Sequence, residues 1–294
     1  MKTPKFWYLK KSTLSVLLYP LSLIWLLLAH LRNLVQTKRE FNVPIICVGN
    51  LIAGGSGKTP LIIELCKILK KKNISVHVIY KAYKTNIYRK VIEVNNKLES
   101  EYIGDEPLLT SKYATTWVCK KRKEGIEKAI IEGAKLILLD DGLQDSSIKK
   151  TLNILVVNEI QGNGNSKIIP AGPLREKIPK SLNKSDCIFF YGSRLNFKKL
   201  FPYYKKRIFY GKIKSNINNL KIKKNARIVA FSGIAHPTNF FSLLIGNKLN
   251  LIKSFSFEDH YKYERKDLNR IVDFSKKTKS STILTTSKDY VKIP

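Results

Sequence analysis

The chain has 294 residues, of which 54 are Lys or Arg and 22 are Asp or Glu, so its formal net charge is +32. With 44% hydrophobic and 10% aromatic residues it can bury a substantial core, which excludes a disordered basic tail. The length suits one large or two modest domains, and the charge predicts an anionic partner such as a phosphate or an acidic lipid surface.

The N-terminal region, residues 1–39, contains an apolar stretch over residues 14–31 that has no Lys, Arg, Asp or Glu. A helix of this length reaches about 27 Å, barely the thickness of a bilayer core, and basic residues flank it on both sides. Apolar residues recur along it at helical spacing, while Ser15, Tyr19 and Ser22 occupy another face. We therefore predict a membrane-associated helix lying in one leaflet, and burial in the protein core is the alternative.

Beyond residue 39, short β-branched runs alternate with helical stretches. The runs expected to form buried strands are residues 43–48, 74–79, 135–139, 153–157 and 186–190. Residues 60–72 and 123–133 are expected to form helices between them. This alternation predicts an α/β fold with a parallel sheet and helices on both faces.

A second, smaller α/β unit is predicted near the C-terminus. Its expected strands are residues 227–231, 251–257 and 282–286, and its expected helices are residues 237–246 and 265–277. We predict a large domain over residues 40–200, a junction over 201–224 and a smaller α/β domain over 225–294. The chain ends at Pro294, so we expect this smaller domain to be shortened at its C-terminus.

Four cysteines lie far apart and form no C-x-x-C pair. They are Cys47, Cys66, Cys119 and Cys187. This spacing gives little support to a zinc site or a thioredoxin-like site. We expect buried free thiols in a reducing compartment, the cytosol.

A glycine-rich loop follows the first expected strand, where residues 49–60 read Gly-Asn-Leu-Ile-Ala-Gly-Gly-Ser-Gly-Lys-Thr-Pro. The loop residues expected to wrap a phosphate with their N–H groups are Gly54, Gly55, Ser56 and Gly57. Lys58 would reach the β- and γ-phosphates, and the Thr59 hydroxyl would hold Mg²⁺. Ile52 replaces the first glycine of the full P-loop pattern. The compact form predicts a nucleoside triphosphate site, and a glycine-rich turn without a ligand is the alternative.

A second strand would supply the metal side of this site. Residues 135–139 are apolar and lead directly to Asp140 and Asp141. This Walker B arrangement holds Mg²⁺ directly or through water. Adjacent acids are common at loop starts, but their place roughly 80 residues after the P-loop indicates a coupled nucleotide–metal site.

Six motifs occur in order along the chain: residues 49–60, 104–109, 140–144, 170–176, 259–261 and 285–289. Together they resemble the tetraacyldisaccharide 4′-kinases, the lipid A kinases, over essentially the whole chain. The resemblance implies a P-loop NTPase-type domain and ATP-dependent phosphorylation of the 4′-hydroxyl of a tetraacylated glucosamine disaccharide 1-phosphate, giving lipid IVA. It also implies ATP and Mg²⁺ as cofactors. The expected partners are the acylated lipid substrate and the inner-leaflet membrane surface, at the cytoplasmic face of the bacterial inner membrane.

The resemblance assigns roles to side chains beyond the P-loop. Asp105 and His260 match the family's base, in which a carboxylate orients an imidazole near the sugar hydroxyl. From the residues alone, His260 would be a surface histidine and Asp105 a helix N-cap. Arg175 would balance the charge of the transferring phosphoryl group, with Glu176 as a further carboxylate at the metal.

Two further nucleotide contacts are expected, and the chain departs from the family pattern around one of them. Arg122 would contact phosphate, and a solvated basic face is the alternative. Tyr83 matches the family tyrosine, although Lys81 and Ala82 replace the usual arginine and glycine before it. Asp145 stands where the family usually has a histidine.

A membrane-associated switch ATPase is the alternative function, because its phosphate loop is similar. Such proteins carry an extra lysine where this chain has Ala53, which argues against that function. A partner nucleic acid has still less support, since no interleaved aromatic and basic recognition motif appears.

Overall fold

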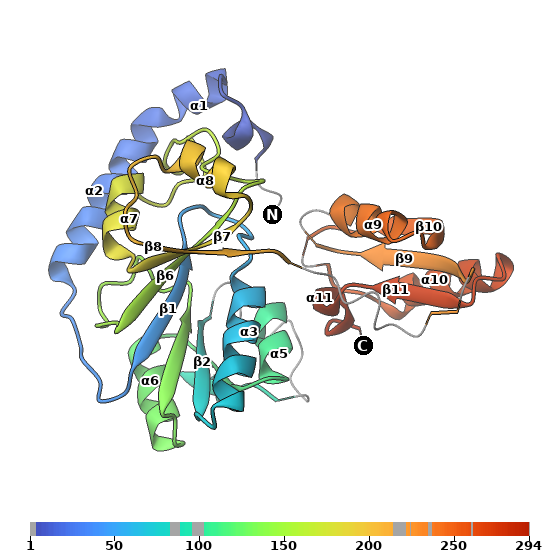
Figure 1. Ribbon diagram of the computed structural model, residues 1–294, viewed down its shortest axis with the longest axis horizontal. Coiled ribbons are helices and arrows are strands. Elements are labelled where there is room, and N and C mark those ends of the chain that lie inside the picture. Colours follow the sequence, from blue (N-terminus) through green and yellow to red (C-terminus); the bar gives the residue numbers. More distant parts are fainter. Residues whose placement is uncertain are drawn as a thin grey trace. The chain divides into compact units, whose positions relative to one another are not determined.

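The computed structural model describes residues 4–82, 89–95, 103–213, 222–223, 225–234, 237–259 and 261–293. They belong to two compact units, each with its own sheet (Figure 1). The larger unit spans Thr3–Asn95 and Thr110–Ile213, and the smaller unit contains Asn96–Leu109 and Lys214–Pro294.

The larger unit is built around an eight-stranded sheet with the order β3-β4-β2-β5-β1-β6-β7-β8. Its strands are β1 (Ile45–Asn50), β2 (Val76–Lys81), β3 (Val91–Glu93), β4 (Thr115–Cys119), β5 (Leu136–Asp140), β6 (Leu152–Asn158), β7 (Cys187–Tyr191) and β8 (Arg207–Gly211). Neighbouring strands are parallel, except for the antiparallel pair β3–β4 at one edge. The predicted strands are confirmed as β1, β2, β5, β6 and β7, each within two residues of its predicted bounds.

The central strands are buried on both faces, which is typical of a parallel sheet covered by helices. All five residues of β5 are buried, and its last residue, Asp140, reaches the carboxyl edge of the sheet. The helices of this unit include α3 (Lys58–Lys71), α6 (Arg122–Ile131), α7 (Ile178–Lys184) and α8 (Arg194–Leu200). The predicted helices are confirmed as α3 and α6, which pack against the central strands.

Strands β3, β4 and β8 are not predicted by the sequence pattern. The edge strand β8 lies within residues 201–224, which the composition indicates as a junction. Phe209 and Tyr210 of this strand are partly exposed, so no continuous buried run marks it. Tyr210 packs edge-on against Phe190 and Phe197, contacts that no local pattern reveals.

The apolar N-terminal stretch forms α1 (Thr13–Leu17) and α2 (Tyr19–Val35), after the 3₁₀ turn η1 (Lys5–Tyr8). Pro20 lies in the first turn of α2, where its missing N–H is tolerated, and this explains the break between the helices. Ser15 and Ser22 are each only 1% exposed. The apolar residues of the predicted stripe that are exposed include Leu14, Leu17, Leu21, Ile24, Leu28 and Leu31.

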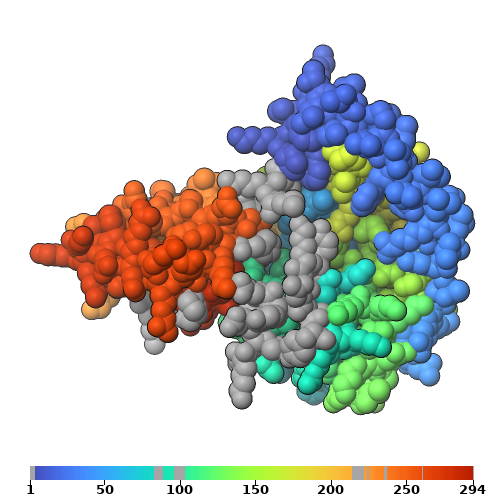
Figure 2. All heavy atoms as spheres, turned by 180° about the vertical axis from the view of Figure 1, so that it is seen from behind, coloured from blue at the N-terminus to red at the C-terminus, as the bar shows by residue number. Residues whose placement is uncertain are grey.

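These N-terminal helices form the outer rim of the larger unit, drawn in blue in Figure 2. The alternative of burial in the protein core is therefore wrong, because the leucines face outward and the serines face inward. Within the described ranges, no helix combines the length and the apolar character needed to cross a bilayer.

The smaller unit has a three-stranded parallel sheet with the order β10-β9-β11. Its strands are β9 (Arg227–Ser232), β10 (Asn250–Ser256) and β11 (Thr282–Thr285), and its helices include α9 (Pro237–Gly246), α10 (Arg265–Lys277) and α11 (Ser287–Tyr290). The predicted strands and helices of this region are confirmed as β9, β10, β11, α9 and α10.

All four cysteines are buried free thiols, as expected. Burial raises the pKa of Cys47 to about 11 and those of Cys66 and Cys119 to about 12. These thiols stay protonated near neutral pH, so they serve as small apolar side chains rather than nucleophiles.

A buried carboxylate, Asp289 of α11, organises the carboxyl edge of the smaller sheet. It accepts hydrogen bonds from the Ser232 hydroxyl (2.8 Å), the Gly233 N–H (3.0 Å) and the Tyr263 hydroxyl (3.0 Å). Lys292 Nζ lies 2.8 Å from it in an ion pair that is almost completely buried. Burial alone would raise the pKa of Asp289, but Lys292 and the hydroxyl donors lower it, so the group is ionised.

Removing one member of this buried pair should be costly. We expect Asp289→Asn to lower the free energy of unfolding of the smaller unit by about 3 kcal/mol, because it leaves the Lys292 charge poorly compensated. In the double variant Asp289→Asn, Lys292→Met, part of the lost free energy of unfolding should be restored. Hydrogen exchange of the β9 amides measures both effects, with Lys266→Met in an exposed ion pair as the control. Additive losses in the double variant would contradict the pairing.

A second test concerns His77 of β2, whose Nδ1 accepts a hydrogen bond from Trp117 Nε1 at 3.2 Å. Burial lowers the pKa of His77, so the folded chain holds it neutral. The unfolded chain binds the proton at about pH 6.5, so stability is full above that pH and falls as the pH drops towards the folded pKa. Urea unfolding measures the free energy of unfolding at about pH 7.5 and about pH 5.5. The decrease between these two pH values should be smaller in His77→Gln than in the wild type. Equal losses would contradict this assignment.

Candidate active site

The phosphate loop joins β1 to α3, and its backbone is held by side chains from distant strands. Gly57, directly before α3, has a φ of +92°, a conformation that favours glycine. A Cβ at this position would lie 2.6 Å from the Tyr191 ring, and the Tyr191 hydroxyl donates to the Gly57 carbonyl at 3.1 Å. Asn50 Nδ2 donates to the Gly54 carbonyl at 3.1 Å. Tyr191 lies 134 residues from Gly57, so no sequence spacing could have indicated it.

The loop contains a polar atom suited to a ligand. The Ser56 hydroxyl is buried and has no hydrogen-bond partner among the residues that the structure describes. Gly55 lies beside it in open space, since an added Cβ would meet no atom within 4 Å. Thr59 is the second residue of α3, so its hydroxyl lies at the helix N-terminus where P-loops bind phosphate and metal.

Two predicted site residues, Lys58 and Arg175, meet at the carboxylate of a third, Asp141, which follows β5. Arg175 Nη1 donates to Asp141 Oδ2 at 2.7 Å, and Lys58 Nζ lies 3.8 Å from Asp141 Oδ1. Burial would raise the pKa of Asp141, but the charges of Lys58 and Arg175 outweigh it and lower the pKa. Asp141 has a φ of +54°, unusual for a residue other than glycine, and such strain is common at functional sites.

The second Walker B carboxylate, Asp140, lies beside the approach to the P-loop because its strand pairs with β1. The register places Asp140 opposite Val48, two residues before Asn50 at the end of β1. Its side chain is buried. The paired acids and the phosphate loop therefore share one edge of the sheet, as expected.

Glu176 is buried and already has several protein partners. Its oxygens accept hydrogen bonds from the Ser181 hydroxyl (2.9 Å), Lys184 Nζ (2.8 Å) and Gln144 Nε2 (3.4 Å). No set of three or more His, Cys, Asp or Glu side chains in the described ranges is arranged to hold a metal ion. The role of Glu176 as a metal ligand stays a prediction, and these contacts show that it anchors the chain beside the site.

Arg122 is buried, so the alternative of a solvated basic face is wrong. Its Nη2 donates to the carbonyls of Asp140 (3.0 Å) and Asp141 (2.9 Å), and its Nη1 donates to Asp145 Oδ2 at 3.0 Å. Burial would raise the pKa of Asp145, but the Ser147 hydroxyl and Arg122 lower it. Arg122 thus holds the turn that presents the two acids, and Asp145 supplies its counter-charge. Direct contact of Arg122 with phosphate stays a prediction.

Residues 165–176, which we call the linking segment, pair with the entrance to the P-loop. The Ala53 N–H donates to the Pro173 carbonyl at 2.8 Å, and the Arg175 N–H donates to the Leu51 carbonyl at 3.0 Å. An antiparallel bridge joins Ile52 to Leu174 between these bonds. This backbone pairing brings Arg175 to Asp141.

The expected base lies only partly within the described residues. Asp105 is buried at the start of α5 (Asp105–Ser111), and its Oδ2 lies 3.9 Å from Lys292 Nζ in the smaller unit. His260 and Tyr83 lie outside the described residues. Lys292, which sequence analysis missed, connects Asp105 to the Asp289 cluster.

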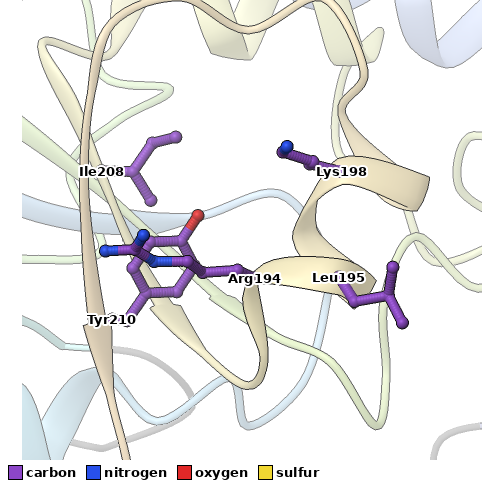
Figure 3. A pocket seen from close by; sticks show the side chains of 5 residues that line it. All are labelled: Arg194, Leu195, Lys198, Ile208 and Tyr210. Atoms are coloured by element: carbon purple, nitrogen blue, oxygen red, sulfur yellow. The ribbon is translucent and has the colours of Figure 1, made fainter.

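A surface pocket at α8 and β8 holds none of the predicted site residues (Figure 3). Its lining residues are Arg194, Leu195, Lys198, Ile208 and Tyr210. The Arg194 guanidinium lies over the Tyr210 ring, 5.5 Å from its centroid. None of the five is a carboxylate, a histidine or a cysteine, the side chains that usually bind metals.

Comparisons with known proteins identify a family that matches most of the chain. The family model "LpxK: Tetraacyldisaccharide-1-P 4′-kinase" matches residues 14–294. A tetraacyldisaccharide 4′-kinase of Rickettsia canadensis is 36% identical over 293 residues, covering 98% of this chain and 87% of that protein. One of Gluconobacter oxydans is 34% identical over 300 residues, covering 100% and 89%.

A solved structure shares the fold. The crystal structure of the "apo" form of LpxK from Aquifex aeolicus in complex with ATP superposes with a TM-score of 0.72 at 24% identity, covering 96% of this chain and 90% of that chain. The family model and the full-length relatives lead to one conclusion: this chain belongs to the tetraacyldisaccharide 4′-kinase family of enzymes.

Proposed function

We propose that this chain transfers the γ-phosphate of ATP to the 4′-hydroxyl of a tetraacylated glucosamine disaccharide 1-phosphate, giving lipid IVA. The observation that carries the proposal is the meeting of Lys58 and Arg175 at Asp141, beside a P-loop whose Ser56 hydroxyl is buried without a partner in the described chain. Two cations so placed can neutralise the charge of a transferring phosphoryl group. A switch ATPase lacks support, because the relatives matched over the full chain are sugar-lipid kinases by name.

ATP and Mg²⁺ are the proposed cofactors. The relative from Aquifex aeolicus is described in complex with ATP. In this chain the N–H groups of the P-loop would bind the phosphates, and Thr59, Asp140 and Asp141 offer the oxygen ligands that Mg²⁺ prefers. When bound, Mg²⁺ would neutralise charge on the β- and γ-phosphates.

The protein's own groups would do the rest of the chemistry. Lys58 and Arg175 would stabilise the phosphoryl charge as the bond to the leaving oxygen lengthens. The pair of Asp105 and His260, in which the carboxylate orients the imidazole as the family resemblance implies, would take the proton of the 4′-hydroxyl as its oxygen attacks phosphorus. Lys292 Nζ lies 3.9 Å from Asp105 Oδ2, so a buried positive charge stands beside this carboxylate.

The catalytic assignment is tested by Lys58→Ala. We expect turnover that depends on the acylated disaccharide to fall by about 10³-fold or more, because a preorganised charge at the phosphates is lost. Circular dichroism should show an intact fold. Lys67→Ala, an exposed lysine on the same helix, should keep near-normal turnover. Normal turnover in a folded Lys58→Ala variant would refute the nucleotide site.

We propose further that α1 and α2 bind the cytoplasmic leaflet of the bacterial inner membrane. Their exposed leucines supply apolar area, and Lys10, Lys11 and Arg32 stand at the two ends of the apolar stretch. The net charge of +32 suits an anionic leaflet. The acyl chains of the substrate stay in that leaflet, so the enzyme must work at its surface.

Replacing outward-facing leucines tests this membrane role. The triple variant Leu17→Ser, Leu28→Ser and Leu34→Ser should weaken binding to anionic vesicles by about tenfold or more, because each leucine buries apolar area in the leaflet. Vesicle flotation measures this, and the residual binding should weaken with salt. Leu195→Ser, an equally exposed leucine on α8, should bind like the wild type. Unchanged flotation of the triple variant would place the membrane contact elsewhere.

A further inference from the structure

The linking segment contacts the phosphate site along one edge and the N-terminal helices along the other. On the first edge, Pro173, Leu174 and Arg175 pair with residues 51–53, and the Arg175 side chain reaches Asp141. On the second edge, its backbone carbonyls accept hydrogen bonds from side chains of η1, α1 and α2. The segment is the shared neighbour of both regions.

Ser22 makes the central contact on the helix side. Its hydroxyl donates to the Ile168 carbonyl at 2.8 Å and accepts from the Ala171 N–H at 3.3 Å. Ser15, in α1, donates to the Ala171 carbonyl at 2.7 Å. Both buried hydroxyls thus face the protein, where they bind backbone groups of the linking segment.

Trp25 extends this contact to the catalytic candidate itself. Its indole Nε1 donates to the Arg175 carbonyl at 3.1 Å, while much of its ring remains exposed with the leucines. Arg175 is therefore held at three points: its carbonyl by α2, its N–H by Leu51, and its guanidinium by Asp141. One end of this chain of contacts is exposed, and the other end reaches Asp141 beside the P-loop.

We propose that Ser22 and Trp25 are positioning residues that couple binding at a lipid surface to binding of nucleotide. When the apolar face of α2 enters a leaflet, the docked helices hold the linking segment, and that segment holds Arg175 and the P-loop entrance. The inference rests on the proposed function, since it takes ATP as the ligand and an anionic leaflet as the surface. Linkage requires the effect to be reciprocal, so nucleotide must strengthen surface binding by the same factor.

The test measures binding and needs no turnover. The affinity for the β,γ-imido analogue of ATP with Mg²⁺ is measured with and without vesicles of phosphatidylethanolamine and phosphatidylglycerol that contain no disaccharide. Vesicle affinity is then measured with and without the analogue. In the wild type we expect each ligand to raise the affinity for the other ligand by about fivefold or more. We call this ratio of affinities the coupling factor, and linkage requires it to be the same in both directions.

Variants separate positioning from anchoring. Ser22→Ala should reduce the coupling factor towards one while vesicle binding persists, because this buried hydroxyl is not part of the exposed face. Trp25→Phe, which removes a donor from a partly exposed ring, should lower the factor in part and guards against misfolding of the first variant. Ser185→Ala removes another buried hydroxyl that donates to a backbone carbonyl, away from the linking segment, and should keep the wild-type factor.

Each outcome decides a different point. A wild-type factor of one, with both ligands bound, overturns the coupling and leaves the kinase assignment standing. Full coupling in folded Ser22→Ala and Trp25→Phe overturns the role of these two residues. A wild type that binds no ATP analogue overturns the proposed function and the coupling together.

Discussion

The candidate site depends on one carboxylate, Asp141, that has two cationic partners. Lys58 comes from the start of α3, Arg175 from the linking segment, and Asp141 from the end of β5. Three stretches of chain far apart in sequence therefore meet at one charge. Without the carboxylate, the two cations would repel each other in a partly buried place. Arg122 reinforces the arrangement by binding the carbonyls of Asp140 and Asp141, so the left-handed turn at Asp141 is held from both sides.

Much of this fold can be predicted from the sequence, because its central strands are continuous apolar runs and its helices follow them at short intervals. The runs that become β1, β5 and β6 are buried on both faces, which leaves a clear local signal. The edge strand β8 has no such signal, since several of its side chains remain exposed. Its place in the sheet depends on backbone pairing with β7.

In the candidate site, too, some residues can be predicted from local sequence patterns and others cannot. The P-loop and the paired acids are local patterns, so spacing alone indicates them. The partners that hold them are not local: Tyr191 supports Gly57 from the end of β7, and Lys292 reaches Asp105 from the C-terminal end of the chain. Arg122 could be assigned to a basic face only because its neighbours in sequence are lysines, whereas the fold turns its guanidinium inward. The spacing of apolar residues also separates a leucine-rich face of the N-terminal helix from a face with serines. It does not by itself decide which of the two faces packs against the protein.

The outward leucines of α1 and α2 have a consequence for the protein away from lipid. Many apolar side chains of these helices are exposed, and large apolar patches exposed to water drive association. In aqueous buffer this face will recruit detergent or another copy of itself, so the apparent size of the purified protein should depend on the amphiphile present. Crowded, detergent-free conditions will favour aggregates nucleated at this rim even though both sheets remain folded.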